Sequence, residues 1–363
     1  MGVSFFNNLP GIILSFLIAL LGIFFSNYLG TEIMGFDKSP ISSILLAVII
    51  GLLVSNIFSI SENFKLGIDF SIKKILRLGI ICLGIRLGLG DIINLGLAAL
   101  PLIIICLVSA LVIVIYLSKK INVSSKMAAL IAVGTSICGA SAIVATAPAI
   151  NADKEEVTYA IANITLFGIL AMFFYPFLAN FIFNGNEYSV GLFLGTSIHE
   201  TAQVAGAGLI YAEQFNSPEV LDIAAVTKLV RNTSMMIIIP LIAFIYHRNL
   251  KTAENISNVS ISSMFPIFIL GFIVMGIFRT IGDTTLQSSG YSFGFIGSND
   301  WAYIISTVKQ VAEISLAIAM ASLGLSTNLK SITSLGVKPF YLGFVAATSV
   351  GIVSFLAIKL IVI

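Results

Sequence analysis

Two basic side chains lie deep inside an apolar stretch of the sequence. Lys228 and Arg231 occur in "AAVTKLVRNTSMMIIIP", three positions apart, so they share one face of a helix. A cation at this depth needs a counter-charge. Arginine offers a planar fork that suits an oxyanion, and lysine offers a mobile point charge. The pair therefore indicates either a site for a small anion or a buried structural ion pair.

Glycine and hydroxyl residues are concentrated in "GTSICGASAIVATAPAI", which begins at Gly134. Lipid cannot satisfy the backbone groups that a helix break exposes, so a break here must face protein or water. Its freed N–H groups and the positive end of a helix dipole would attract an anion. Close helix packing is the alternative, because small residues let backbones approach each other. The residues predicted to line an anion site here are Gly134, Thr135, Ser136, Cys138, Gly139 and Ser141.

The same four letters return in "GTSIHETAQVAGAG", which begins at Gly195. His199 and Gln203 are four positions apart and share a helix face, and Thr196 lies one turn earlier. We expect these three residues to complete the anion site; the alternative for His199 is a hydrogen bond to a neighbouring carbonyl. Position 203 is Gln, so the zinc motif HExxH is incomplete. We therefore predict no metal site and no cofactor.

Acidic residues inside apolar segments are candidates for coupling to an ion. Glu200 follows His199, while Lys309 and Glu313 have i,i+4 spacing in "STVKQVAEISL". An acid within a membrane span costs roughly 2.5–3.5 kcal/mol to insert, so it normally faces a cavity or a partner. We predict that Glu200, Glu313 and Lys309 couple anion movement to a proton or sodium ion. Structural pairing of Lys309 with Glu313 is the alternative.

The elements that position these residues are membrane helices. The 363 residues are 58% hydrophobic and only 10% charged, against about 25% charged in soluble domains. Apolar runs recur along the whole chain, which predicts an all-α, polytopic membrane protein with a single domain over residues 1–363 and broken helices. About eleven spans are expected, at residues 10–29, 40–58, 70–90, 97–117, 125–150, 156–183, 188–211, 219–246, 262–283, 301–326 and 337–362.

Several other classes of protein are excluded by the composition. The three cysteines lie in apolar segments without metal-ligand spacing, so they indicate neither disulfides nor a metal centre. The net charge of +2 and the absence of a basic run argue against a nucleic-acid partner.

Lys and Arg are more frequent on the side that holds the N-terminus, which predicts a cytoplasmic N-terminus and a C-terminus outside.

Two segments of similar sequence predict an internal repeat. "LGIRLGLGDIINLG" (83–96) matches "LGLSTNLKSITSLG" (323–336) at several leucine and glycine positions. The two copies end spans that run in opposite directions, as in an inverted-topology repeat of a secondary transporter. Chance similarity between apolar helix ends is the alternative.

The sequence resembles the YeiH-like family of bacterial inner-membrane proteins, which are described as sulfate exporters. The resemblance rests on "RLGIICLGIRLGLGD" (77–91), "SICGASAIVATAP" (136–148), "GTSIHETAQVAG" (195–206), "KLVR" (228–231) and "AMASLGLST" (319–327). It covers most of the chain and implies a secondary transporter with inverted repeats and crossed, broken helices.

Taken together, these patterns predict a secondary transporter that exports or exchanges a small, sulfate-like or sulfonate anion across a bacterial inner membrane. The expected partners are the anion, the lipid bilayer, a coupling proton or sodium ion and a second copy in a homodimer. An anion channel lined by the same glycine-rich segments is the alternative. An intramembrane enzyme would need His199 to activate a serine or Cys138, which no spacing in the sequence establishes. We expect no enzymatic activity.

Overall fold

The computed structural model describes residues 5–36, 39, 41–250, 266–328 and 336–363. Helices dominate these residues, and the only strand-type pairing among them is an isolated bridge between Ser292 and Ile296. Seven described helices are long and apolar enough to cross a membrane. They are Leu9–Ile33, Leu89–Ile121, Lys154–Ile182, Glu219–Phe244, Phe268–Ser289, Ser298–Ser326 and Val337–Ile361. The chain is therefore a polytopic, all-α membrane protein, as the composition predicts.

The number of long helices is lower than the eleven spans expected from apolar runs. The segments 125–150 and 188–211 are each divided by a break, so neither forms one continuous long helix. The segments 40–58 and 70–90 contain α-helices of only 15 and 8 residues, Ser43–Ile57 and Leu76–Leu83. Hydropathy shows how apolar a segment is but not where its helix ends. It therefore overestimates the number of continuous long helices.

The described chain divides into two compact units. Unit 1 contains residues 1–95, 209–218 and 267–329, and unit 2 contains residues 96–208, 219–266 and 330–363. Each unit is assembled from three separate stretches, so the chain passes back and forth between them. The division has no simple counterpart in the sequence, where one domain over residues 1–363 is predicted.

Unit 1 is built from the N-terminal helices and the pair α14–α15. Its α-helices are α1 (Leu9–Asn27), α2 (Ser43–Ile57), α3 (Glu62–Phe70), α4 (Leu76–Leu83), α14 (Phe268–Ser289) and α15 (Ser298–Ser326). Shorter elements are η1 (Phe5–Asn7), the π-helical η2 (Tyr28–Ile33) and η3 (Ser71–Ile75), and η4 (Gly84–Arg86). The first copy of the proposed repeat covers η4 and the start of α5, whereas residues 329–335 of the second copy lie outside the described residues.

Helix α15 is the centre of unit 1, where it packs along α1, α2 and α4. The contact with α2 is close because Gly51 and Gly324 face each other. A Cβ atom added to Gly324 would lie 2.3 Å from the carbonyl oxygen of Val48, and one added to Gly51 would lie 2.6 Å from that of Ala321. Small residues at such a crossing let two membrane helices approach backbone to backbone.

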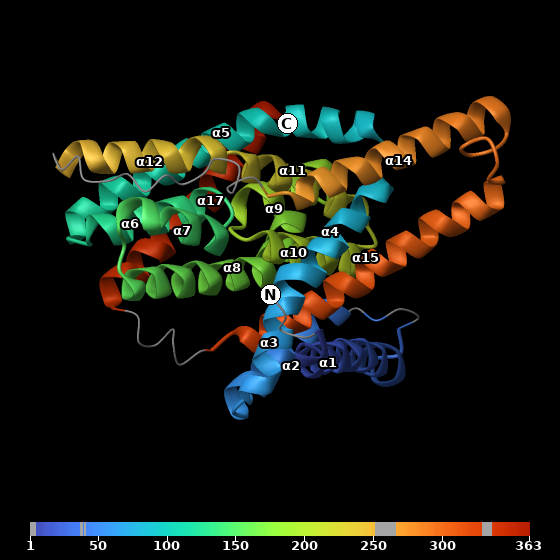
Figure 1. Ribbon diagram of the computed structural model, residues 1–363, viewed down its shortest axis with the longest axis horizontal. Coiled ribbons are helices and arrows are strands. Elements are labelled where there is room, and N and C mark those ends of the chain that lie inside the picture. Colours follow the sequence, from blue (N-terminus) through green and yellow to red (C-terminus); the bar gives the residue numbers. More distant parts are fainter. Residues whose placement is uncertain (1–4, 37–38, 40, 251–265, 329–335) are drawn as a thin grey trace. The chain divides into compact units, whose positions relative to one another are not determined.

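A turn joins α14 to α15 at the end of a long helical pair (Figure 1). Trp301 is buried there, its Nε1 donates to Asp283 at 2.8 Å, and its ring packs edge-on against Phe278 and Phe293. Asp283 also accepts from Arg279 at 2.5 Å. This cluster fixes the two helices at their shared end.

Unit 2 holds the remaining helices, and it contains every residue of the two glycine-rich segments. Its helices are most of α5 (Leu89–Ile121), α6 (Ser125–Ser136), α7 (Ala140–Thr146), η5 (Pro148–Ile150), α8 (Lys154–Ile182), α9 (Glu187–Ser197), the start of α10 (Thr201–Phe215), α11 (Glu219–Thr233), α12 (Met235–Leu250) and α17 (Val337–Ile361).

Polar residues define the starts of the unit 2 helices. The side chain of Ser124 accepts from the Met127 amide before α6, and that of Asn186 accepts from the Ser189 amide before α9. Asp153 and Glu156 form a capping box at the start of α8. These contacts satisfy backbone N–H groups that have no partner inside the helix.

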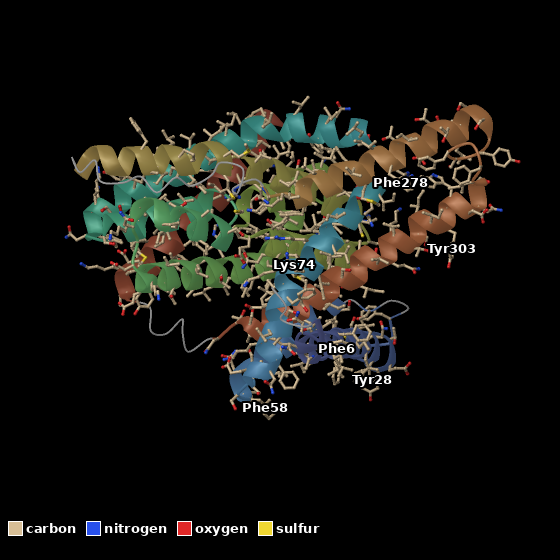
Figure 2. All side chains as sticks on the ribbon, in the orientation of Figure 1. Phe6, Tyr28, Phe58, Lys74, Phe278 and Tyr303 are labelled. Atoms are coloured by element: carbon tan, nitrogen blue, oxygen red, sulfur yellow. The ribbon has the colours of Figure 1, made fainter. Side chains whose placement is uncertain are left out.

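Apolar side chains cover much of the outer surface. In unit 1, Phe6, Tyr28, Phe58 and Tyr303 are all exposed and are labelled in Figure 2. Unit 2 exposes Phe174, Phe181 and Leu360 in the same way. Exposed leucine and phenylalanine side chains suit contact with acyl chains, and exposed tyrosine suits the interface between lipid and water. The surface therefore agrees with a protein embedded in a bilayer.

Candidate functional site

The first glycine-rich segment breaks a helix, as the sequence predicts. Helix α6 ends at Ser136, and α7 begins at Ala140. Between them Ile137 has φ −119° and ψ −97°, and Gly139 has φ +74° and ψ −128°. A residue with a Cβ atom rarely adopts the conformation of Gly139, so a glycine is needed at this turn.

The second glycine-rich segment contains a second break. Helix α9 ends at Ser197, Ile198 is extended with φ −81° and ψ 140°, and α10 begins at Thr201. The two breaks, residues 137–139 and 198–200, are called the double break below. They meet directly, because the Glu200 carboxylate accepts a hydrogen bond from the Ala140 amide at 3.1 Å.

Lys228 points from α11 into the double break and is fully buried. Its Nζ atom donates to the carbonyl oxygens of Ile137 at 2.8 Å and Ile198 at 2.9 Å, and to that of His199. These three acceptors match the three donors of a lysine ammonium group. One side chain therefore satisfies unwound carbonyls of both breaks.

Arg231, one turn further along α11, is also fully buried. Its Nε donates to Ser136 at 2.8 Å, and one terminal nitrogen donates to Thr196 at 2.6 Å and to Ile198 at 3.2 Å. The other terminal nitrogen donates to Thr135. All these acceptors are backbone carbonyls at the C-terminal ends of α6 and α9.

The partners of the two cations differ from those expected from the sequence. A carboxylate or a bound anion was expected to supply the counter-charge for Lys228 and Arg231. The described hydrogen bonds of both side chains go to carbonyl oxygens instead. The C-terminal end of each broken helix carries about half a negative charge, and its last carbonyls lack intrahelical donors. The broken ends themselves therefore need the cations.

Gln203 stabilises the second break rather than standing free in it. Its Oε1 accepts from the Glu200 amide at 3.3 Å, and its Nε2 donates to the Thr165 carbonyl of α8 at 3.2 Å. The side chain is completely buried. It thus caps the start of α10 and ties this helix to α8.

Thr196, Ser136 and Cys138 are buried close to the double break. The hydroxyl of Thr196 lies 2.7 Å from that of Ser354 on α17 and donates to the Leu192 carbonyl at 2.6 Å. Ser136 donates to Val133 at 3.3 Å, and the Cys138 sulfur lies 3.2 Å from that of Met235. Each of these side chains therefore has a protein partner.

Four other buried residues near or beside the double break hold polar atoms without a hydrogen-bond partner among the described residues. They are both ring nitrogens of His199, the Thr135 and Thr227 hydroxyls and the Asn232 Oδ1. His199 is 1% exposed, Asn232 is 2% exposed, and the two threonines are completely buried. Burying such groups without a partner is costly, so they mark a place where a ligand or water can bind.

The remaining predicted residues take different places. Gly134 is buried in α6 against Ile143 and Ile164, so it serves packing. Ser141 is exposed at the start of α7. Lys309 and Glu313 lie on α15 in unit 1, where Glu313 is half-exposed and 3.8 Å from Arg86. Of the three predicted coupling residues, the structure brings only Glu200 together with Lys228 and Arg231 inside unit 2.

Sequence reasoning missed two partners of the double break. Asn232 donates from its Nδ2 to the Thr201 hydroxyl at 2.9 Å, and Ser354 meets Thr196 from α17. Asn232 follows Arg231 directly and lies four residues from Lys228, so its spacing was a usable signal. Ser354 is distant in sequence from both breaks and has no such signal.

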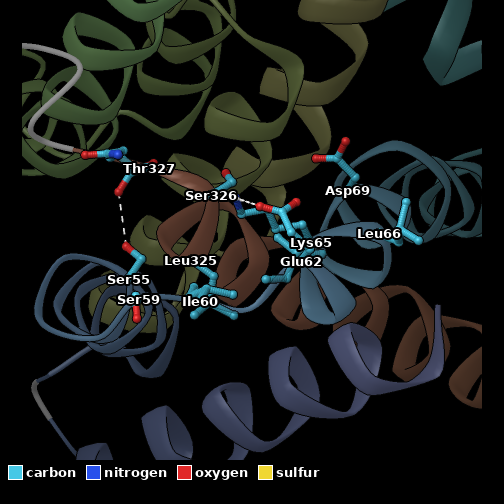
Figure 3. Close-up of a pocket in the computed structure, with 12 residues that line it drawn as sticks. Ser55, Ser59, Ile60, Glu62, Lys65, Leu66, Asp69, Leu325, Ser326 and Thr327 are labelled. Atoms are coloured by element: carbon cyan, nitrogen blue, oxygen red, sulfur yellow. Dashed lines mark hydrogen bonds and ion pairs between the residues drawn. The ribbon is translucent and has the colours of Figure 1, made fainter. Parts of the chain in front are cut away.

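Unit 1 contains a separate pocket of about 540 Å³ between the ends of α2, α3 and α15 (Figure 3). Ser55 donates to the Thr327 carbonyl at 3.1 Å on one side of it, and Lys65 pairs with Glu62 at 2.5 Å on the other. Asp69 pairs with Lys73 at 3.1 Å. The acidic groups of this pocket are thus balanced by lysines of the same helical run, unlike the buried charges of the double break.

Comparison with known proteins identifies relatives over nearly the whole chain. The model of the family described as "Conserved hypothetical protein 698" matches residues 10–343. A UPF0324 membrane protein of Fusobacterium nucleatum is 35% identical and one of Streptococcus agalactiae is 33% identical, each over 96% of both chains. Another from Streptococcus pneumoniae is 32% identical over 93% of this chain and 92% of its own length. The chain therefore belongs to the UPF0324 family of membrane proteins, which is the YeiH-like family that its motifs indicate.

Proposed function

We propose that the protein is a secondary transporter for a small anion, which binds beside the double break of unit 2. The observation that carries the proposal is the meeting of two broken helices over Lys228 and Arg231. Discontinuous helices of this kind place polar backbone at membrane depth, where transporters bind their substrates.

The charge balance of the double break favours an anion. Each of the two C-terminal helix ends carries about half a negative charge, and each of the two N-terminal ends carries about half a positive charge. These partial charges cancel. Lys228 and Arg231 add two positive charges, and Glu200 supplies one negative charge. One positive charge is left in excess among these three side chains. A small anion would neutralise it, and the unpartnered atoms of His199, Thr135 and Asn232 could donate to or accept from its polar atoms.

Uptake into proteoliposomes tests this proposal. The purified full-length protein should accumulate at least one labelled anion from a panel of sulfate, methanesulfonate and oxalate, with saturation and with acceleration by the same anion on the opposite side. Arg231→Met should abolish uptake, whereas Lys119→Met, at an exposed position of α5, should leave it unchanged. No uptake of any anion in the panel would contradict the proposal.

Two other functions predict different results. An anion channel would give single-channel currents in a planar bilayer and no acceleration by anion on the opposite side. A hydrolytic enzyme would need an activated nucleophile. Cys138 contacts Met235, and no described hydrogen bond links Cys138 or Ser136 to His199.

We also propose that the protein lies in the bacterial inner membrane with a cytoplasmic N-terminus and an external C-terminus. The distribution of Lys and Arg between the predicted loops supports this orientation. A C-terminal alkaline phosphatase fusion should then be active, and a fusion within the loop after α5 should be inactive. The reverse pattern would contradict the orientation.

A further inference from the structure

Glu200 connects the two breaks through a single carboxylate. Its backbone belongs to the second break, and its Oε1 accepts from the Ala140 amide at 3.1 Å, on the first break. The side chain is only partly buried. Next to it, Ser141 is exposed and Thr201 is partly exposed. Glu200 is therefore less buried than the two cations.

Gly139 makes room for this carboxylate. A Cβ atom added to Gly139 would lie 2.2 Å from the Glu200 Cγ and 3.1 Å from its Oε1. The positive φ of Gly139 turns the Ala140 amide toward the second break. The first break is thus shaped around the Glu200 side chain, whose carboxylate lies at a position suited to a bound anion.

Unpartnered polar atoms belong to residues that neighbour Glu200 in the chain or contact such a neighbour. His199 precedes Glu200 and is buried; its ring lies near the Thr135 backbone, and neither ring nitrogen makes a hydrogen bond of normal geometry to a described residue. Asn232, also buried, donates to Thr201, which follows Glu200, while its Oδ1 has no partner among the described residues. A ligand with polar atoms, or water, bound at the double break would give these groups a partner.

The charged and titratable groups that face Glu200 are Lys228 from α11 and Cys138 from the first break, while His199 and Arg231 lie close to Lys228 and to each other. Both cations donate to carbonyl oxygens and stay in place. An anion that binds here would lie beside a like charge on Glu200, which is unfavourable in a partly buried site. Protonation of Glu200 removes this repulsion and weakens its hold on the Ala140 amide.

We propose that Glu200 releases the Ala140 amide when it takes up a proton, and that the transported anion then occupies the vacated place. The carboxylate plus one proton gives the neutral acid, which carries that proton with the anion. After both leave on the opposite side, the carboxylate returns to Ala140. One proton therefore accompanies each anion, in the same direction. This mechanism rests on the proposed transport function.

Paired fluxes in proteoliposomes test the mechanism. The vesicles contain a pH dye, and potassium with valinomycin clamps the membrane potential. An inward gradient of sulfate or methanesulfonate is then applied at equal pH on both sides. The wild-type protein should acidify the lumen by about one proton per anion, as linked binding requires. Glu200→Gln, whose neutral side chain resembles the protonated acid and holds the Ala140 amide only weakly, should exchange anion across the membrane but lose at least 90% of the proton flux.

A second variant removes the other side of the contact. Ala140 is the first residue of α7, where proline is tolerated, so Ala140→Pro deletes the N–H group without changing the acid. Its apparent affinity for the anion should fall, because the anion loses the amide donor that it meets once the carboxylate has left. Glu155→Gln, an exposed acid in the same unit, should keep the wild-type affinity and proton-to-anion ratio.

Binding measured in detergent provides an independent readout. Thermal-shift titrations with sulfate and methanesulfonate should show the apparent Kd of the wild-type protein rising about tenfold per pH unit where the acid is ionised. For Glu200→Gln it should change less than twofold over the same range. Equal pH slopes, or equal proton-to-anion ratios, in wild type and Glu200→Gln, or equal anion affinity in wild type and Ala140→Pro, would overturn the mechanism while leaving anion transport intact. A wild-type protein that moves no anion would instead overturn the transport function, and the mechanism with it.

Discussion

The ammonium group of Lys228 lies 2.8 Å from the carbonyl oxygen of Ile137, at a position 91 residues earlier in the chain. It also lies 2.9 Å from the carbonyl of Ile198 in the other break. A lipid-embedded protein must satisfy every polar backbone group internally. Lys228 is therefore a structural requirement of the double break as well as a source of positive charge.

Replacing Lys228 with methionine should destabilise the protein strongly. Three buried carbonyl oxygens would lose this donor; that of Ile198 would keep Arg231, whereas those of Ile137 and His199 would be left unsatisfied at about 1–3 kcal/mol each. We expect a clear fall of the thermal unfolding temperature in detergent, measured by scanning fluorimetry, and loss of anion uptake. Lys119→Met should change neither, and a Lys228→Met protein as stable as wild type would show that water replaces the ammonium group.

Replacing Gly139 with alanine should cost more than the backbone strain alone. The positive φ costs about 1–3 kcal/mol for a residue with a side chain, and the new Cβ would collide with Glu200. Gly290→Ala is a control for positive φ without a contact, since Gly290 has φ +77° and ψ −2°, in the left-handed helical region, with open space around it, whereas ψ −128° puts Gly139 outside that region. In the Glu200→Ala background, the cost of Gly139→Ala should fall toward that of the control, as measured by thermal unfolding. An unchanged cost in that background would show that the two residues are not in contact.

Replacing His199 with phenylalanine should separate binding from stability. Neither ring nitrogen makes a hydrogen bond of normal geometry to a described residue, and the nearby Thr135 carbonyl also accepts from Arg231, so an apolar ring of similar shape leaves no protein group unpaired. We expect an unfolding temperature equal to or above that of wild type, together with at least a tenfold weaker apparent affinity for the transported anion. Asn163→Leu is a useful contrast, because it removes a 2.7 Å hydrogen bond to the Pro339 carbonyl and should lower stability. Unaltered anion affinity in His199→Phe would exclude His199 from the site.

The hydroxyl pair Thr196–Ser354 should behave as a unit. Both groups are completely buried and lie 2.7 Å apart. Thr196→Val and Ser354→Ala should each cost about 1 kcal/mol, and the double variant should cost less than their sum, because no group remains unpaired. Denaturant or thermal unfolding of the four proteins measures this coupling. If the two single costs simply add in the double variant, the Thr196–Ser354 hydrogen bond contributes nothing to the free energy of unfolding.

The local breaks could be predicted because their cause is local. Gly139 permits a backbone conformation that other residues avoid, and the surrounding small and hydroxyl residues have little reason to face lipid. The i,i+3 spacing of Lys228 and Arg231 likewise fixes their common face on α11. These properties belong to a few neighbouring residues, so the sequence shows them directly.

The partners of those residues could not be predicted, because they come from distant parts of the chain. Lys228 meets Ile137, Arg231 meets Thr135, and Thr196 meets Ser354, each across a large sequence separation. Charge arithmetic suggested carboxylates or a bound anion as partners of the cations. It did not include the partial charges of the broken helix ends, which become concentrated only when both breaks are brought together.

The sequence alone determined that this is an all-helical membrane protein with two polar interruptions and two buried cations, because hydropathy, glycine content and helical spacing are local properties. Tertiary structure decided that the interruptions meet, that backbone carbonyls hold Lys228 and Arg231, and that Glu200 faces the Ala140 amide. The physical reason is that lipid leaves unwound backbone no solvent partner, so these contacts had to be made between segments that only folding brings together.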